Sequence, residues 1–417
     1  MTVLFLSTSG RIGGAERALL TLAKQLRGRH PDWHLILLSG EDGPLVESAS
    51  VLGVEVKVLA LGRPLRAAGD GLTWRLRGGL RLVRLFFATV SYRQRLIQII
   101  RSLRPDIVHS NGMKMHVLAS SLSRRGGGMM PLKTHANSDR PALICHMHDY
   151  VRRGNIARMI FRWVGSRSDC VVAPSSSIAV DLSAAGIPKS KIRTIRNAVD
   201  LDIFRPDGKV LDLDQKSGLQ PATHGVMRVG LIATFAHWKG HRTFLRALGL
   251  LPSAIGIRAY VIGGPIYQTA QSQVTLAELQ EAAKRDCPSI NVGFTGALDD
   301  VEAAYRSLDV VVHASIAPEP FGLVIVEAMA SGVPVIISRS GGACELFEEG
   351  ITALSHAPGD ATELAEQIVK LAGDARLNRV LRANALTAAR ERFAPYAMGT
   401  RFGDLYEELA DRRRRRC

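Results

Sequence analysis

The stretch from residue 318 to 337 restricts the fold more than any other part of this 417-residue chain. It reads as a loop, a helix and a buried strand in direct succession. Leu323, Val326 and Ala330 recur at helical spacing, and a Gly-Val-Pro string then ends the helix. The apolar run at 335–337 follows at once, as expected for a strand inside a sheet. This succession predicts an α/β fold with a parallel sheet.

Two carboxylates bracket the start of the predicted helix. Glu319 lies in the loop, and Glu327 lies about one turn inside the helix. Between them, the backbone N–H groups of Gly322 and Leu323 offer a seat for a phosphate, because a helix N-terminus carries unpaired donors and a partial positive charge. A nucleotide sugar has hydroxyls at both ends and phosphate in the middle, and it fits this arrangement. The alternative is a surface glutamate in the loop and a solvated one on the helix.

The string E-P-F-G-L-V-I-V-E-A-M-A-S-G-V-P-V-I at 319–336 resembles the signature of retaining glycosyltransferases of family GT4. The hallmark of that family is a glutamate pair with seven residues between, here Glu319 and Glu327, with Phe-Gly shortly after the first. The resemblance implies the GT-B fold. In that fold two Rossmann-like parallel-sheet domains face each other across a cleft, and a C-terminal helix crosses back to the first domain.

The resemblance covers nearly the whole chain and divides it. Residues 1–205 are expected to form the acceptor-side domain, to which the helix at 395–411 returns. Residues 206–225 are expected to be a linker and 226–394 the nucleotide-sugar-binding domain. The basic tail at 412–417 is expected to be disordered.

Two features of the first domain are candidates for substrate contacts. Gly13 and Gly14 follow the first strand, and without Cβ atoms they let backbone N–H groups approach a phosphate or sugar closely. The alternative is a tight turn that requires positive φ. The Gly-Gly-Ala-Glu-Arg string resembles the first loop of many GT4 enzymes. His148 and Asp149 end a later strand, and the pair resembles the His-Asp that lies beside the transferred sugar in this family.

The loop after the first strand of the second domain departs from the family pattern. GT4 members usually offer an arginine and a lysine there, five residues apart, to hold the nucleotide diphosphate. Lys239 matches the lysine, but Thr234 stands at the arginine position. Another basic group, Arg242 or Arg339, is therefore expected to assist.

Further candidates complete the set that the resemblance implies. Gly263 and Gly264 end another strand, and Thr295 lies in the strand and turn whose main chain reads the base. The catalytic set is His148, Glu319 and Lys239. The donor-binding set is Gly13, Gly14, Thr234, Lys239, Gly263, Gly264, Thr295, Glu319, Phe321, Gly322, Leu323 and Glu327.

The expected activity is transfer of a sugar from a nucleoside diphosphate sugar to a glycan or lipid-linked acceptor, with retained configuration. Neither a metal nor another cofactor is expected. Asp-x-Asp, a metal signature of a different glycosyltransferase superfamily, occurs at 200–202 and 212–214, but both copies fall in the hinge or linker. Lys239 and the helix start at Gly322 are expected to stabilise the departing diphosphate instead.

The net charge of +16 favours an anionic partner. Between residues 63 and 104, ten arginines alternate with Trp, Phe and Leu against the single acid Asp70. This pattern is typical of a helix lying in the interface of an anionic membrane, the alternative being a helix packed on the sheet with a solvated basic face. No zinc-finger spacing, aromatic ribonucleoprotein pattern or basic recognition helix is found, so nucleic acid is not expected.

Five scattered cysteines, an odd number without C-x-x-C spacing, favour free thiols in a reducing compartment. With no charged leader and no apolar run of about 20 residues, we expect a cytoplasmic protein, peripheral on the inner face of the membrane. Two rivals stay open: a GT-B epimerase or phosphorylase acting on sugars, and a non-catalytic basic protein that binds membranes or nucleic acid.

Overall fold

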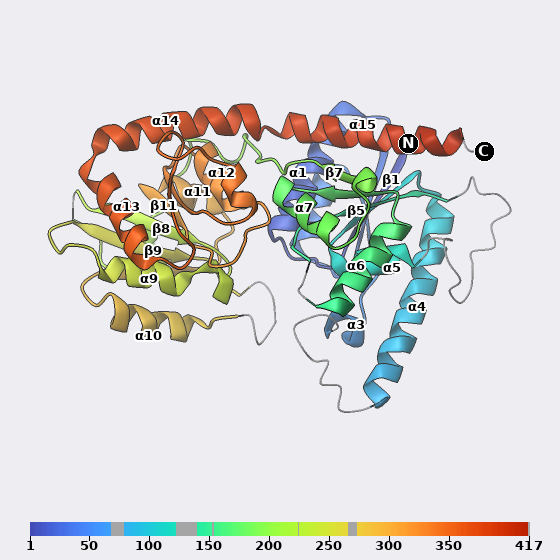
Figure 1. Ribbon diagram of the computed structural model, residues 1–417, viewed down its shortest axis with the longest axis horizontal. Coiled ribbons are helices and arrows are strands. Elements are labelled where there is room, and N and C mark those ends of the chain that lie inside the picture. The colour runs from blue at the N-terminus through green and yellow to red at the C-terminus, as the bar shows by residue number, and fades with distance from the viewer. Residues whose placement is uncertain (68–78, 122–139, 152–153, 224, 266–272, 416–417) are drawn as a thin grey trace. The chain divides into compact units, whose positions relative to one another are not determined.

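The computed structural model describes residues 1–67, 79–121, 140–151, 154–223, 225–265 and 273–415. The chain divides into two compact units (Figure 1). Unit 1 consists of Met1–Asn197 and Pro395–Cys417, and unit 2 of Ala198–Ala394. Each unit has its own parallel sheet, so the expected α/β class is confirmed.

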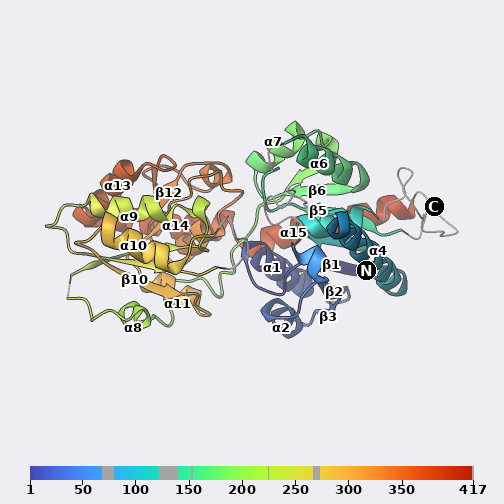
Figure 2. The ribbon, with the colours of Figure 1, turned by 90° about the horizontal axis from the view of Figure 1, so that it is seen from below.

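Unit 1 is built on a seven-stranded parallel sheet of order β3-β2-β1-β4-β5-β6-β7, most of which can be followed by its labels in Figure 2. Its strands are β1 (Thr2–Ser7), β2 (His34–Ser39), β3 (Glu55–Val58), β4 (Ile107–Asn111), β5 (Ala142–His146), β6 (Cys170–Ala173) and β7 (Ile192–Thr194). Its helices are α1 (Gly14–Arg29), α2 (Pro44–Val51), α3 (Arg63–Ala67), α4 (Gly79–Leu103), α5 (Met113–Ser120), α6 (Asn155–Arg167), α7 (Ser176–Ala184) and α15 (Pro395–Arg414).

The apolar central strands explain why helices cover this sheet. Alternate residues of a strand point to opposite faces. Leu4 and Leu6 of β1 therefore belong to one buried cluster, together with residues of α4, α5, α6 and α7. Phe5 lies between them in the sequence, and its ring contacts that of His109 at 5.4 Å between centroids. β1 pairs with β2 on one side and with β4 on the other.

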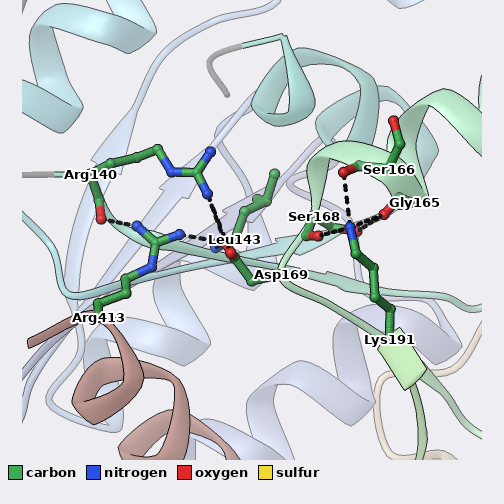
Figure 3. A network of polar contacts seen from close by, with 8 residues as sticks. All are labelled: Arg140, Leu143, Gly165, Ser166, Ser168, Asp169, Lys191 and Arg413. Carbon is green, nitrogen blue, oxygen red and sulfur yellow. Dashed lines mark hydrogen bonds and ion pairs between the residues drawn. The ribbon is translucent and has the colours of Figure 1, made fainter. Parts of the chain in front are cut away.

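The C-terminal helix α15 belongs to unit 1, although the chain reaches it only after unit 2. Near its end, the Arg413 guanidinium donates to the Asp169 carboxylate at 2.5 Å and to the Arg140 carbonyl (Figure 3). The same carboxylate accepts a bond of 2.9 Å from the backbone N–H of Leu143 at the start of β5. Asp169, which directly precedes β6, therefore connects the last turns of α15 to the start of β5.

Unit 2 is built on a six-stranded parallel sheet of order β10-β9-β8-β11-β12-β13. Its strands are β8 (Met227–Ile232), β9 (Ile257–Ile262), β10 (Asn291–Gly296), β11 (Val310–His313), β12 (Val335–Ser338) and β13 (Leu354–His356). Its helices are α8 (Leu213–Ser217), α9 (His241–Gly249), α10 (Leu276–Asp286), α11 (Val301–Arg306), α12 (Leu323–Ala330), α13 (Ala361–Gly373) and α14 (Ala375–Arg392).

Two hydrophobic clusters cover the two faces of this sheet. Val229 and Leu231 of β8 pack with α9, α10 and α13, whereas Ile232 packs with α11, α12 and α14. The predicted succession of loop, helix and buried strand is present as the loop before α12, α12 itself and β12, whose four residues are all buried. This order places the loop before α12 at the carboxyl end of β11, where parallel α/β sheets bind their ligands.

Three segments differ from simple expectation. Within 206–225, expected as a linker, α8 is capped by the Asp212 side chain and Leu213 is fully buried in unit 2. The helix α15 runs through Arg414, so part of the expected tail is helical. The basic segment contains α3 and α4, while its residues 68–78 lie outside the described part of the chain. In that described part, no helix combines the length and apolarity needed to cross a bilayer.

Candidate functional site

Glu319 lies at the centre of a group of polar side chains in unit 2. It sits in the loop that joins β11 to α12. The loop backbone is held from the neighbouring segment: the Gly342 N–H donates to the Glu319 carbonyl at 2.7 Å, and the Glu319 N–H donates to the Ser340 carbonyl at 3.3 Å. These bonds fix the position from which the Glu319 side chain extends.

The carboxylate of Glu319 accepts three kinds of donor. The Lys239 ammonium lies 2.8 Å from Oε2 and 3.0 Å from Oε1, and the Ser315 hydroxyl donates to Oε2 at 2.9 Å. Nε2 of His313 lies 3.3 Å from the same oxygen. Burial alone raises the pKa of this carboxyl, but the charge of Lys239 and the contact with His313 outweigh burial and hold the pKa far below its usual range. Glu319 is therefore a carboxylate anion, and its side chain is only 11% exposed.

The loop that carries Lys239 lies tightly against the loop that carries Glu319. Lys239 ends a short 3-10 turn, and Gly240 follows with φ of +71°, a left-handed conformation that glycine adopts without strain. A Cβ at position 240 would lie 1.8 Å from the Ala314 carbonyl oxygen. Only glycine fits there, because a side chain would collide with backbone. The contact of Lys239 with Glu319 thus depends on close backbone packing.

Glu327 is oriented by a residue that the sequence analysis did not identify. It lies in α12, its side chain is buried, and its Oε2 accepts a hydrogen bond of 2.7 Å from the Tyr305 hydroxyl. Tyr305 belongs to α11 and is fully inaccessible to solvent. The sequence predicts only that a tyrosine at an apolar helix position is buried. Its contact with a carboxylate is seen in the structure alone.

Thr234, Gly263, Gly264 and Thr295 lie at the carboxyl ends of β8, β9 and β10. The Thr234 hydroxyl donates to the Gly264 carbonyl at 3.1 Å, and the Gly263 N–H donates to the Gly296 carbonyl at 2.9 Å. The Thr295 hydroxyl donates to the same Gly296 carbonyl at 2.9 Å. Gly263 has φ of +133°. Thr234, which replaces the arginine of the family pattern, therefore joins two loops.

The residues at the start of α12 divide between backbone and core. Gly322 precedes the helix with φ of +99°. The Phe321 side chain is buried in the core of unit 2 and meets the Phe393 ring edge-on at 6.1 Å between centroids. Leu323 packs partly buried against the same core. Phe321 can therefore offer a ligand little more than its main chain.

The two arginines considered as helpers of Lys239 have other neighbours. Arg339 forms an ion pair of 2.7 Å with Glu363 and donates to the Ser355 hydroxyl. Arg242 lines a hollow with Glu278 and other residues of α10. In the part of unit 2 that the structure describes, Lys239 is the cation paired with Glu319.

In unit 1, the glycine loop is held by a carboxylate at its helix start. The Gly13 N–H donates to Glu16 Oε2 at 3.1 Å, and Gly13 has an ordinary φ of −108°. The alternative that Gly13 serves a turn with positive φ is therefore wrong. Burial raises the pKa of Glu16, an effect that bonds from backbone N–H groups partly offset.

His148 lies close to the same loop through Asn111. Its Nε2 lies 2.5 Å from Oδ1 of Asn111, and Nδ2 of Asn111 donates to the Ala15 carbonyl at 3.3 Å. Burial lowers the pKa of His148 to about 4, so the imidazole is neutral at pH 7. The structure thus brings His148 and the glycine loop, which are far apart in the sequence, into one cluster in unit 1.

The structure places buried histidines next to His148. The His146 ring lies 4.3 Å from that of His148 and 5.2 Å from that of His109. Nδ1 of His109 lies 2.6 Å from the Tyr406 hydroxyl of α15. Burial lowers the pKa of His109 to about 3. The side chains of His109 in β4 and His146 in β5 are both buried inside unit 1.

In the two Asp-x-Asp strings, the carboxylates of Asp200, Asp212 and Asp214 have protein partners. Asp212 caps α8, and Asp214 pairs with Arg258 at 2.8 Å and accepts a bond of 2.7 Å from the Tyr260 hydroxyl. The Asp202 N–H donates to Asp200 at 3.0 Å. These contacts give the three carboxylates structural roles within unit 2.

Comparison with known families matches both units. Residues 12–203 match the model described as "Glycosyltransferase Family 4", and residues 225–388 match that described as "Glycosyl transferases group 1". The lipopolysaccharide core biosynthesis mannosyltransferase LpcC of Rhizobium leguminosarum bv. viciae is 30% identical over 249 residues, which is 60% of this chain and 67% of that protein. The sulfoquinovosyl transferase SQD2 of Arabidopsis thaliana is 26% identical over 301 residues, covering 69% of this chain.

The chain spans only about half of SQD2, since the match covers 54% of that protein's length. Among solved structures, Anabaena HepE in complex with UDP-glucose resembles this chain with a TM-score of 0.78 at 23% identity, covering 98% of this chain and all of that one. WaaG, described as a glycosyltransferase involved in lipopolysaccharide biosynthesis, resembles it with a TM-score of 0.66 at 13% identity, covering 97% and 99%. These likenesses show a shared fold.

Proposed function

This chain belongs to the glycosyltransferases of group 1 and family 4, and on that premise we propose that it transfers a sugar from a nucleoside diphosphate sugar to an acceptor hydroxyl. The names of its relatives support the reaction class, since they include a mannosyltransferase and a sulfoquinovosyl transferase. The HepE complex with UDP-glucose supports the donor class.

The observation that carries the proposal is the contact of Lys239 with Glu319 beside the start of α12. A partly buried carboxylate held by a lysine, a serine and a histidine is oriented before any ligand arrives. In the proposal, the sugar hydroxyls of the donor bind Glu319, and the diphosphate approaches Lys239 and the backbone at Gly322. The ribose hydroxyls bind Glu327, which Tyr305 keeps in place.

The chemistry follows from where charge develops. As the bond between the anomeric carbon and the phosphate oxygen breaks, negative charge grows on the diphosphate and positive charge on the sugar. The ammonium of Lys239 and the N-terminal dipole of α12 oppose the negative charge. We propose that these groups act without a divalent ion.

Retention of configuration is proposed to arise from attack on the face that the diphosphate leaves. The acceptor oxygen forms the new bond to the anomeric carbon while the bond to phosphate breaks. The acceptor proton passes to the departing phosphate oxygen. Glu319 serves as a clamp rather than a nucleophile in this scheme, because Lys239 and Ser315 already engage its oxygens.

One assay tests the proposal against its rivals. Purified protein is incubated with UDP- or GDP-sugars, with and without a candidate glycan or lipid-linked acceptor, in buffer that contains EDTA. We expect release of nucleoside diphosphate that depends on acceptor and persists in EDTA, with the α-configured donor yielding an α-linked product by NMR. Isomerisation of the donor alone supports an epimerase, and cleavage by phosphate supports a phosphorylase. Loss of turnover in EDTA that magnesium restores contradicts the metal-free scheme.

A membrane surface is proposed as the place where the acceptor is met, on a separate observation. Val83, Phe86 and Phe87 of α4 are at least half exposed, Phe87 by 64%, and Arg84 lies exposed among them. Aromatic rings exposed beside arginine are suited to the interface of an anionic bilayer. A lipid-linked acceptor would be reached from such a surface.

A further inference from the structure

We propose that Asn111 is a positioning residue that sets the tautomer of His148, so that His148 presents a bare Nδ1 as an acceptor for a substrate hydroxyl. This inference rests on the proposed transferase function for its substrate, but the tautomer itself is a property of the unliganded chain. It gives Asn111 a role that is separate from filling the core.

The position of Asn111 allows it to reach both partners. It is the last residue of β4, which lies between β1 and β5 in the sheet. Its register partners are Ser7 at the end of β1 and His146 at the end of β5. The loops leaving these strands lead to α1 and to His148. A side chain at the end of β4 therefore lies between the glycine loop and the histidine.

The orientation of the Asn111 amide follows from its partner on the side of α1. Nδ2 faces the Ala15 carbonyl oxygen at 3.3 Å, and a carbonyl oxygen can only accept a hydrogen bond. If the amide were turned over, two oxygens would face each other. Oδ1 is thus fixed on the side of His148, where it lies 2.5 Å from Nε2.

The tautomer of His148 follows from the amide orientation. An amide oxygen accepts and does not donate, so Nε2 of His148 must carry the proton. Burial lowers the pKa of His148 to about 4, so the ring holds a single proton at pH 7. Nδ1 is then a lone-pair acceptor. Among the residues that the structure describes, no hydrogen bond to Nδ1 of His148 is found, and His148 as a whole residue is only partly buried.

A bare imidazole nitrogen selects the kind of group that can bind beside it. It accepts from a hydroxyl, whereas it offers no proton to a carboxylate or phosphate oxygen. The structure therefore favours a sugar or acceptor hydroxyl, and disfavours an anionic oxygen, next to His148. His146, whose ring lies 4.3 Å away, has a pKa lowered by burial and adds no charge that would attract an anion.

The direct test is NMR on protein labelled with ¹⁵N-histidine, with the His148 signals assigned by their loss in His148→Gln. At pH 7.5 the wild-type protein is expected to show a protonated Nε2 and an unprotonated Nδ1 for His148. Asn111→Leu keeps the branched shape of the side chain but has no acceptor, and it should shift His148 toward a mixture of tautomers. Ser110→Ala, at the neighbouring buried position of β4, is the matched control and should leave the wild-type pattern.

The outcomes separate this inference from the proposed function. A protonated Nδ1 in the wild-type protein overturns the inference even if transfer is observed. The Nε2-protonated form in a protein that transfers no sugar supports the inference and rejects the function. If both hold, Asn111→Leu should lower kcat by about tenfold or more, as expected for a misplaced polar contact, with a smaller change in donor KM. Unchanged kcat in a variant with altered tautomer overturns the role in positioning. Should Asn111→Leu fail to fold, the wild-type spectrum still decides the tautomer.

Discussion

The hydroxyl of Tyr305 donates a hydrogen bond of 2.7 Å to Oε2 of Glu327, and both side chains are buried in unit 2. The bond joins α11 to α12 and limits the rotation of a carboxylate that we propose to hold the ribose. Tyr305, a core residue, therefore positions the carboxylate that is proposed to bind the sugar nucleotide.

Tyr305→Phe is expected to weaken donor binding while keeping the core packed. Removal of one hydrogen bond to a charged group costs about 1.5–3 kcal/mol, so donor KM should rise by about tenfold or more with a smaller change in kcat. Glu327→Ala removes the carboxylate itself and should lower kcat/KM by a factor of about 10² or more. Steady-state kinetics over a range of donor concentrations measures both. Equal donor KM in Tyr305→Phe and wild type would contradict the role of Tyr305.

Lys239→Met is expected to lower both transfer and stability, and the loss of stability should depend on pH. The folded pKa of Glu319 is depressed below its ordinary value of 4.5. Its carboxylate therefore contributes stability above that pH, and the contribution is lost on acidification. The Lys239 and Glu319 side chains are 21% and 11% exposed, so breaking their partly buried pair should cost up to about 3 kcal/mol. The difference between variant and wild type should be large at pH 7 and should shrink toward pH 3.5 in calorimetry.

Lys284→Met provides the matched control for that experiment. Lys284 pairs with Glu281 on the surface of α10, where both side chains are more than two-thirds exposed. A solvent-screened pair of this kind contributes little. Transfer should persist, and the unfolding temperature should change little at any pH. A difference between Lys239→Met and wild type that stays constant from pH 7 to 3.5 would show that Glu319 does not gain its charge stabilisation from Lys239.

The buried histidines predict that unit 1 loses stability in mild acid. Burial lowers the pKa of His109 and His116 to about 3, below the ordinary value of 6.5. Between these pH values the unfolded chain binds protons that the folded chain excludes, so stability falls as pH falls. Each histidine contributes up to about 1.4 kcal/mol per pH unit. His116→Gln should flatten the decline between pH 6.5 and 4 in denaturant titrations. A slope equal to that of the wild-type protein would contradict this role of His116.

Phe86→Ser combined with Phe87→Ser is expected to weaken attachment to anionic vesicles. The two exposed rings contact each other on α4, and serine removes their apolar surface without altering the arginines. Flotation with vesicles containing phosphatidylglycerol should recover wild-type protein and much less of the variant. Val51→Ser removes an apolar residue of α2 that is even more exposed, and it should float like wild type. Equal recovery with neutral and anionic vesicles would reject the electrostatic part of the proposal.

Asp169→Ala is expected to loosen the end of α15. This carboxylate accepts bonds from Arg413, Arg140 and the Leu143 backbone, and its removal leaves these donors unsatisfied. Hydrogen exchange over the last turns of α15 should quicken by about tenfold or more, corresponding to 1.4 kcal/mol. Glu408→Ala removes only an exposed pair with Arg412 and should change the exchange little. Unchanged exchange in Asp169→Ala would show that other contacts suffice to hold the helix.

The parts of the fold that depend on local pattern were predictable from the sequence. The loop, helix and strand around Glu319 follow from helical spacing, a helix stop and an apolar run, and the parallel sheets follow from repetition of such units. The contact of Lys239 with Glu319 spans 80 residues. Resemblance to a family placed both residues in one site, but their direct contact was not predicted, because no local rule joins positions so distant.

What escaped prediction has a common physical cause. Tyr305 and His146 lie at positions where local sequence indicates only burial, and burial does not tell which polar partner a side chain meets. The chain at 206–225 looked like a linker because it is rich in Pro, Gly and charged residues. Asp214 nevertheless pairs with Arg258 and Tyr260, and these contacts hold α8 against unit 2. Arg258 and Tyr260 belong to β9, which lies more than 40 residues after Asp214 in the sequence.

The absence of room at Gly240 has a consequence for engineering this chain. Any larger residue at that position would clash with the Ala314 carbonyl. The clash would move the loop that carries Lys239 away from the loop that carries Glu319. Mutant libraries meant to retune sugar preference should therefore hold position 240 constant and vary its surroundings. The ion pair of Lys239 with Glu319 therefore depends on the absence of a side chain at position 240.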